Sequence, residues 1–207
     1  MKIQDWRKVT MQTADNLYCS GNDILPRAIK LANRANGIKG LAAEMTHVAK
    51  IVREDGRMWV FESTTKNWNG KTGIQINYFE EWLKHYNGKV YHQSIIRTAG
   101  LRADEMRRVF RIKRNEMYGL PYESGVGGLV ELMSSFERAE NINPAKLDEK
   151  ARTAEVHCSE GTIIIDQAIE RVSATVSPHK HPPARFLDGT YENNLTGCKL
   201  GELTQIK

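Results

Sequence analysis

The sequence predicts an α+β fold in which strands come early in the chain and helices surround the sheet. Two observations carry this prediction. Two strand-like runs flank an Asp-Gly turn in the first third of the chain, and helical periodicity dominates after residue 100. The 207 residues, 40% of them hydrophobic, suffice to bury a core, so we expect a single domain over residues 1–207.

The first predicted elements are a helix and a β-hairpin. Residues 22–43 indicate a turn that leads into a helix, which ends at a glycine-containing segment. Residues 46–53 and 58–63 are rich in β-branched and aromatic residues, and Glu54-Asp55-Gly56-Arg57 separates them. Asp-Gly between two such runs is a strong hairpin signal, so we predict two paired strands here.

The middle of the chain alternates short elements. We predict a loop over residues 66–73, a short amphipathic helix over about 78–86, a strand over 89–96 and a longer helix over 102–117. Asn87-Gly88 is expected to end the short helix.

The last part of the chain is expected to contain further helices and then an irregular segment. We predict a helical excursion over about residues 125–155, including a helix over 129–140. An apolar helix over 159–172 follows and is opened by Cys158. From Ser177 onward, repeated prolines predict an irregular segment packed along the surface.

Composition narrows the class of protein only slightly. The net charge of +5 permits contact with nucleic acid, anionic membranes or acidic cell-wall polymers, and selects none of them. Residues 1–20 lack the apolar core of a signal peptide, and no apolar run is long enough to span a membrane. The three cysteines form no CxxC pair, which favours a reducing compartment. We therefore expect a cytoplasmic protein.

Cys158 is the first candidate for chemistry. A cysteine at a helix N-terminus lies at the positive end of the peptide dipoles, which favours the nucleophilic thiolate. The alternative is that Cys158 is simply a small buried side chain, as most lone cysteines are.

The hairpin predicts a second pair of candidates. If Asp55-Gly56 forms its turn, His47 and Glu62 are diagonal neighbours on one face of the hairpin and lie within side-chain reach. A carboxylate beside an imidazole fixes its tautomer and stabilises the imidazolium, as a catalytic base requires. Apolar residues share this face, namely Ala49, Ile51 and Val60. The alternative is a polar pair on a solvated face.

In the order His, Glu, Cys, the chain resembles the circularly permuted branch of the NlpC-type papain-like amidases, the YiiX-like group. The resemblance covers roughly residues 18–190 and rests on motifs that are weak singly and stronger in their shared order. These motifs are Gly21-Asn22-Asp23-Ile24-Leu25, Thr46-His47-Val48, Val60-Phe61-Glu62-Ser63, Gly73-Ile74-Gln75-Ile76, Trp82-Leu83, Gly88-Lys89-Val90, Gly119-Leu120-Pro121-Tyr122 and Cys158-Ser159-Glu160. Asn22 and Gly161 depart from the family pattern at the site entrance and on the cysteine helix.

The resemblance implies a papain-like core and a cysteine hydrolase. Cys158 would be the nucleophile, His47 its base and Glu62 the residue that orients His47. Tyr122 and Asp23 are expected to contact the substrate, and no cofactor or metal is expected. The backbone N–H of Cys158 would help to hold the oxyanion.

The resemblance leaves the substrate open. Cleavage of an amide or peptide bond, as in peptidoglycan, is favoured over acyl transfer to lipids, because the lipid acyltransferases of this branch tend to place Asn where this chain has His157. A cell-wall substrate would require a delivery route other than a signal peptide.

Two other classes of function stay open. Several candidate metal ligands occur without the spacing of a known zinc site, namely His47, His157, Cys158, His179 and His181. The basic stretch over residues 97–114 could contact nucleic acid or another anionic surface. It also contains acidic residues, and a charged helix is more often a solvated face, so a nucleic-acid partner is disfavoured. The oligomeric state is not predicted.

Overall fold

The computed structural model describes the chain except for residues 1, 66–67, 69, 99, 121–156 and 179–180. The predicted helix over 129–140, the excursion over 125–155 and Tyr122 therefore lie outside the described residues. Within the described part no helix is both long and apolar enough to cross a membrane.

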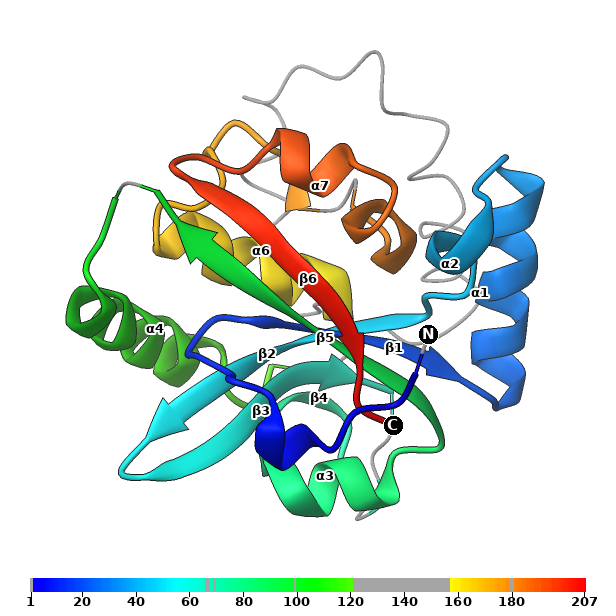
Figure 1. Ribbon diagram of the computed structural model, residues 1–207, viewed down its shortest axis with the longest axis horizontal. Coiled ribbons are helices and arrows are strands. Elements are labelled where there is room, and N and C mark those ends of the chain that lie inside the picture. Colours follow the sequence, from blue (N-terminus) through cyan, green and yellow to red (C-terminus); the bar gives the residue numbers. More distant parts are fainter. Residues whose placement is uncertain (1, 66–67, 69, 99, 121–156, 179–180) are drawn as a thin grey trace.

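The fold is built on one six-stranded antiparallel sheet (Figure 1). Its strand order is β4-β3-β2-β1-β5-β6. The strands are β1 (Asn16–Gly21), β2 (His47–Glu54), β3 (Arg57–Thr64), β4 (Gly73–Tyr78), β5 (Gly88–Arg97) and β6 (Cys198–Gln205). Each neighbouring pair is antiparallel, and β1 lies between β2 and β5.

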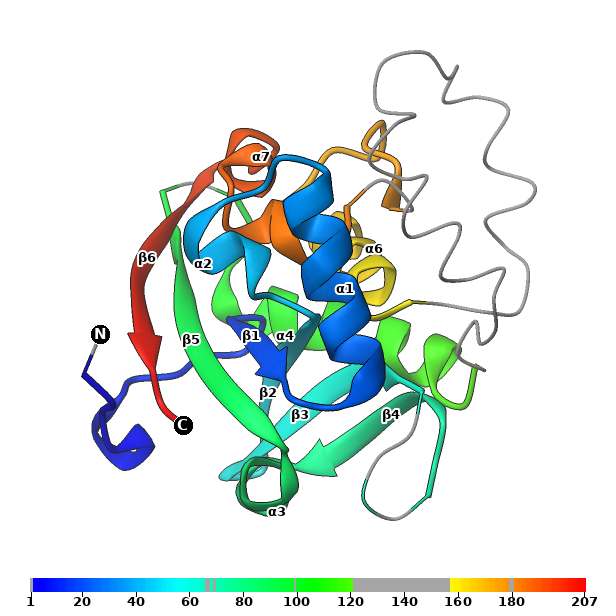
Figure 2. The same ribbon diagram turned by 90° about the vertical axis from the view of Figure 1, so that its right-hand side faces the viewer.

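Helices surround this sheet, which confirms the predicted α+β class. The α-helices are α1 (Ile24–Ala35), α2 (Gly40–Ala43), α3 (Phe79–His85), α4 (Ala103–Met117), α6 (Cys158–Ala168) and α7 (Thr190–Asn193). Two short 3-10 helices are η1 (Trp6–Lys8) and η5 (Pro183–Phe186). In Figure 2 the sheet curves around α4 and α6, while α3 lies on its outer side.

Apolar side chains alternate between the two faces of β2 and β3, and an apolar cluster lies on each face. On one face Ala49, Ile51 and Val60 pack with residues of α3. On the other face Val52 and Phe61 pack with residues of α4 and α6. The sheet is thus buried on both sides, and α6 packs directly on β2 and β3.

The predicted hairpin is confirmed in its register. Glu54 pairs with Arg57, which makes Asp55 and Gly56 the two turn residues. Both have positive φ angles, 51° and 73°, as the common two-residue hairpin turn requires. This turn fixes which side chains of β2 and β3 share a face.

Several predicted boundaries were wrong. The helix that Cys158 opens ends at Ala168 rather than at residue 172, because Glu170 takes a left-handed backbone conformation with φ 58°. Val172 instead forms a β-bridge with Leu195. The segment after Ser177 was predicted to be irregular, yet it contains η5, α7 and β6.

Candidate active site

Cys158 occupies the first turn of α6 and is almost completely buried, with 6% of its surface exposed. The carboxylate of Glu160 accepts a hydrogen bond from the backbone N–H of His157 at 3.3 Å, which ties the chain ahead of the helix to its first turn. The hydroxyl of Thr162 donates to the carbonyl of Cys158 at 3.1 Å. These contacts fix the sulfur at the positive end of the helix dipole.

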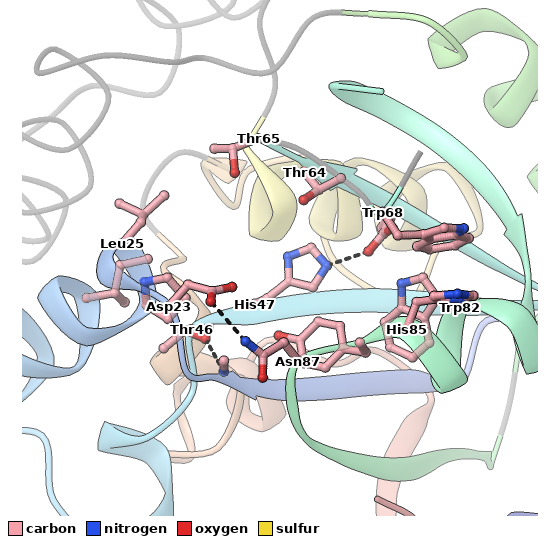
Figure 3. Close-up of a pocket in the computed structure, with 15 residues that line it drawn as sticks. Asp23, Leu25, Thr46, His47, Thr64, Thr65, Trp68, Trp82, His85 and Asn87 are labelled. Carbon is pink, nitrogen blue, oxygen red and sulfur yellow. Dashed lines mark hydrogen bonds and ion pairs between the residues drawn. The ribbon is translucent and has the colours of Figure 1, made fainter. Parts of the chain in front are cut away.

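His47 begins β2, and its ring is held by Glu62 on β3 (Figure 3). Nε2 of His47 lies 2.9 Å from Oε2 of Glu62. The other carboxylate oxygen of Glu62 accepts a hydrogen bond from Nδ2 of Asn77 at 3.0 Å. Glu62 is 4% exposed, so both of its oxygens are engaged in a largely dry environment.

Cys158 lies close enough to His47 to act on the pKa of its ring. Because Nε2 faces Glu62, Nδ1 is the ring nitrogen available to a second partner. Burial lowers the pKa of His47, but negative charge on Cys158 and the hydrogen bonds with Cys158 and Glu62 outweigh burial and raise the pKa from 6.5 to about 10. The arrangement therefore favours the protonated form of the His47 ring.

A pocket of about 430 Å³ opens beside His47. Asp23 and Leu25 from α1 and its N-cap form one wall. Trp68 and His85 form part of the opposite wall, where their rings stack with centroids 5.3 Å apart (Figure 3). A substrate could therefore reach the imidazole between a carboxylate and an aromatic surface.

The structure brings most of the predicted site residues together. His47 hydrogen-bonds to Glu62, Cys158 acts on the pKa of the same ring, and Asp23 lines the adjoining pocket. The carboxylate of Asp23 accepts a hydrogen bond from Nδ2 of Asn87 at 2.9 Å. Tyr122 lies outside the described residues. The catalytic and substrate-binding roles of these residues stay predictions.

Sequence reasoning missed three contributors to this site. Tyr86 follows α3 and stacks on His47, with ring centroids 6.4 Å apart. Asn77 holds Glu62, and Trp68 lies in the segment predicted only as loop. Recognising the strand at residues 73–78 would have indicated Asn77, because its register with β3 places it diagonally opposite Glu62.

The other two cysteines occupy different environments. Cys19 is fully buried on β1, and burial, followed by the charge of Glu62, raises the pKa of its thiol well above the ordinary value. Burial also raises the pKa of Cys198 on β6. Neither residue lies at a helix N-terminus, so Cys158 alone among the three cysteines combines a helix terminus with an imidazole partner.

The candidate metal ligands do not converge in the described part of the chain. Among those residues no group of three or more His, Cys, Asp and Glu side chains is placed to hold a metal ion. His179 lies outside them. His181 is engaged elsewhere, by the carbonyl of Ser177 and the amide of Asn194.

Comparison with known proteins supports the fold and goes no further. No family model and no curated protein matches the chain. A crystal structure described as the metalloprotein YiiX from Escherichia coli O157:H7 is similar in fold, with a TM-score of 0.52. It shares 14% sequence identity, over 96% of this chain and 98% of that one. The chain therefore has a YiiX-like α+β fold.

Proposed function

We propose that this protein is a papain-like cysteine hydrolase of the permuted NlpC type that cleaves an amide or peptide bond. The observation that carries the proposal is His47 at the edge of a pocket, where Glu62 hydrogen-bonds to its ring and Cys158 raises its pKa. The order of these residues along the sequence and the YiiX-like fold agree with it.

In the proposed reaction the Cys158 sulfur attacks the carbonyl carbon of the substrate. A C–S bond forms, the carbonyl electron pair moves to oxygen, and the backbone N–H of Cys158 stabilises that oxyanion. The C–N bond then breaks as His47 donates its proton to the leaving amine. Water attacks the thioester, His47 accepts its proton, and the released acid leaves the thiolate to pair again with the imidazolium.

Glu62 is assigned the role of orienting His47. Its bond to Nε2 keeps Nδ1 directed at the sulfur, and its charge stabilises the imidazolium formed in each half-reaction. Asn77 holds the carboxylate in turn. We assign the pocket to a peptide or peptidoglycan-like substrate, with Asp23 as a partner for a hydroxyl or ammonium group.

Alkylation of the cysteines tests the proposed nucleophile directly. The reduced protein is treated with iodoacetamide between pH 5 and 9, and each cysteine is followed by peptide mass spectrometry. We expect Cys158 to react at a pH well below the ordinary thiol pKa of about 8.5, and to lose this advantage in His47→Ala. Cys198, which is partly exposed, is the internal control. Equal reactivity of Cys158 and Cys198 at every pH would contradict the proposal.

A groove on another part of the molecule favours a second candidate function, the binding of an anionic ligand. It lies between the β2–β3 hairpin and α4 and has a volume of about 640 Å³. Its arginines outnumber its acidic residues: Arg53, Arg57, Arg107, Arg108, Arg111 and Arg114 against Glu54, Asp55 and Asp104. Glu54 contacts Arg111 at 2.7 Å and Arg114 at 2.6 Å, and these contacts hold α4 against the hairpin.

A charge-reversal experiment separates this function from hydrolysis. We expect Arg107→Glu/Arg108→Glu to weaken binding of a short single-stranded oligonucleotide and to reduce the salt dependence of that binding. Alkylation of Cys158 should not change. If the unaltered protein does not bind the oligonucleotide at low salt, the groove has no such role.

A further inference from the structure

A completely buried ion pair joins the strand that carries His47 to the helix that carries Cys158. We infer that this pair, Lys50 with Asp166, is a positioning device that sets where α6 lies along β2, and hence where Cys158 lies relative to His47. The inference rests on the proposed function, because it concerns the geometry of the proposed catalytic pair.

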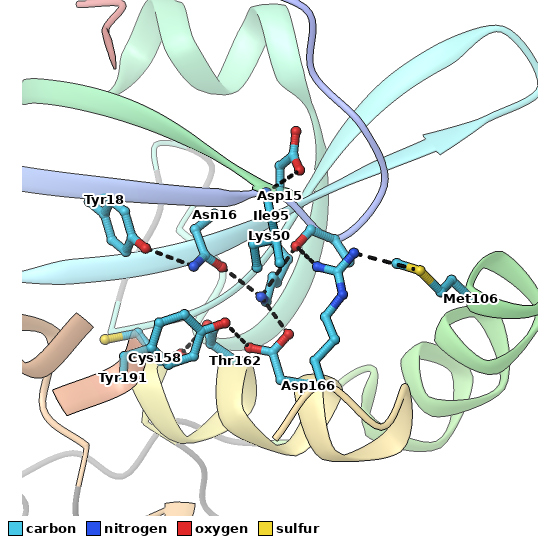
Figure 4. Close-up of polar contacts among 12 residues, drawn as sticks. Asp15, Asn16, Tyr18, Lys50, Ile95, Met106, Cys158, Thr162, Asp166 and Tyr191 are labelled. Atoms are coloured by element: carbon cyan, nitrogen blue, oxygen red, sulfur yellow. Dashed lines mark hydrogen bonds and ion pairs between the residues drawn. The ribbon is translucent and has the colours of Figure 1, made fainter. Parts of the chain in front are cut away.

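The contacts around Lys50 are directional and complete. Its Nζ lies 2.7 Å from Oδ1 of Asp166, and both side chains have 0% of their surface exposed. The same ammonium donates to Oδ1 of Asn16 at 2.6 Å and to the carbonyl of Ala14 at 3.3 Å. A lysine has three N–H donors, so each has an acceptor. The second carboxylate oxygen of Asp166 accepts from the Tyr191 hydroxyl at 2.7 Å (Figure 4).

The spacing along helix and strand shows how this pair relates to the candidate site. Asp166 follows Cys158 by eight residues on α6, which is about 12 Å along a helix. Lys50 follows His47 by three residues on β2, which is about 10 Å along a strand. Lys50 shares with Val52 the face of β2 that α6 covers, whereas His47 shares the opposite face with Ala49 and Ile51. The ion pair therefore fixes α6 on the sheet, and Figure 4 shows Cys158 and Asp166 spaced along this same helix.

The apolar contacts in the rest of this interface constrain the position of α6 less strictly. Ile163 and Ile165 bury α6 in the apolar clusters of the sheet, and such packing is non-directional. A slip of one residue would move the helix by about 1.5 Å, and a misplacement of about 1 Å can cost a hundredfold in rate. A directed ion pair supplies the constraint that apolar packing lacks.

Stability alone does not account for the pair. Removing a lysine and a carboxylate from water is costly, and replacing a buried ion pair with neutral side chains is often neutral or stabilising. Burial lowers the pKa of Lys50 from 10.5 to about 8, although the negative charge of Asp166 acts to raise it. Burying the charged pair therefore costs desolvation free energy, which neutral side chains would avoid if the contact served stability alone.

The test removes both charges together. In Lys50→Met/Asp166→Asn the side-chain volumes are similar, and the new amide still offers an oxygen to Tyr191. We expect this variant to keep its fold by circular dichroism, while Cys158 alkylation at pH 7 slows about tenfold or more. The His47 pKa, followed by NMR, should move from about 10 toward 6.5. Ile38→Ala, which opens a cavity in a separate apolar cluster, is the matched control for general destabilisation and should change neither quantity.

A milder variant covers the case in which the double variant does not fold. Tyr191→Phe removes one hydrogen bond from Asp166 and leaves all charges in place. We expect it to slow Cys158 alkylation and lower the His47 pKa in the same direction by a smaller amount. If the folded variants retain the alkylation rate and His47 pKa of the unaltered protein, the positioning role is overturned. If the unaltered protein itself shows neither rapid alkylation nor a raised His47 pKa, the proposed function fails instead.

Discussion

At the residue scale, the candidate site depends on how one imidazole is shared between two partners. The His47 side chain is only 12% exposed, which disfavours its charge, yet Cys158 and Glu62 favour that charge. Of the two, Cys158 has the larger influence on the pKa of His47. The two partners can therefore be ranked by experiment.

We predict that the His47 pKa falls further in Cys158→Ala than in Glu62→Gln. In the unaltered protein the pKa is expected near 10, so the ring stays protonated across neutral pH and loses its proton only as the pH rises toward 10. Removing the sulfur leaves burial to act against a single carboxylate. NMR titration of the imidazole signals, with His47→Gln to identify the resonance, measures both changes. A ring that titrates near 6.5 in the unaltered protein would exclude the thiolate–imidazolium pair.

We expect Asn77 to contribute more to the stability of the fold than a neutral side chain usually does. It donates to a buried carboxylate, and hydrogen bonds to charged groups contribute about 1.5–3 kcal/mol. We predict that Asn77→Ala lowers the free energy of unfolding by that amount in urea titrations at pH 7. Asn87→Ala is the control, because the amide of Asn87 bonds to Asp23 in an exposed setting, and it should cost less than about 0.5 kcal/mol. Equal effects of the two variants would show that Glu62 does not depend on Asn77.

At the element scale, the sequence predicts the hairpin well because its turn is local. Asp55 and Gly56 both adopt positive φ angles, and the turn then dictates register for the whole of β2 and β3. The contact between His47 and Glu62 follows from that register, which is why it could be predicted from the sequence. The helices at 79–85 and 103–117 were predicted for the same reason, since their periodicity is local.

The strands β1, β4 and β6 were not predicted, because their stability comes from neighbours far away in the sequence. β1 is buried on both faces between β2 and β5, yet Asn16, Ser20 and Gly21 give it little intrinsic strand preference. β6 is an edge strand that carries charged residues and Gly201. At Gly201 a Cβ atom would lie 2.2 Å from the Ser94 hydroxyl, so the glycine reflects a close approach to β5.

A substitution at Gly88 tests how closely the backbones of β1 and β5 approach each other next to the site. Its φ is 153°, and an added Cβ would lie 2.2 Å from the backbone oxygen of Ser20. We predict that Gly88→Ala lowers the free energy of unfolding by about 3 kcal/mol or more, from backbone strain and overpacking together. Gly56→Ala, at φ 73° with open space around it, is the matched control and should cost about 1–2 kcal/mol. Both values follow from urea unfolding, and equal costs would contradict the close approach.

At the scale of the whole molecule, the sequence could not reveal the contact that joins the strand carrying His47 to the helix carrying Cys158. Lys50 and Asp166 are 116 residues apart, and nothing local in either segment signals the pair. Tyr191 on α7 adds a third distant segment, and it packs on Phe186 with ring centroids 4.5 Å apart. The C-terminal segment thus covers the interface between α6 and the sheet, although its prolines predicted only an irregular surface chain.

His181 anchors this covering segment in a form that requires a neutral ring. Nδ1 lies 3.2 Å from the Ser177 carbonyl, which can only accept, so Nδ1 carries the proton. Nε2 lies 3.1 Å from the amide nitrogen of Asn194, which can only donate, so Nε2 is unprotonated. Burial lowers the pKa of His181, and Arg185 acts in the same direction against the Ser177 bond and Asp188.

The expected consequence is a loss of stability in mild acid that originates in this segment. Because the folded-state pKa lies below the unfolded value of about 6.5, the unfolded state binds more protons, and His181 contributes stability above pH 6.5 that is lost as the pH falls through the folded-state pKa. We predict that, between pH 7 and pH 5, the unaltered protein loses more free energy of unfolding than His181→Gln does. The carboxylates are common to both proteins and cancel in the difference. Hydrogen exchange at pH 5 should show the loss first in residues 181–195, because protonation of Nε2 removes the acceptor for Asn194. Equal losses in the two proteins would mean that the covering segment does not depend on a neutral His181.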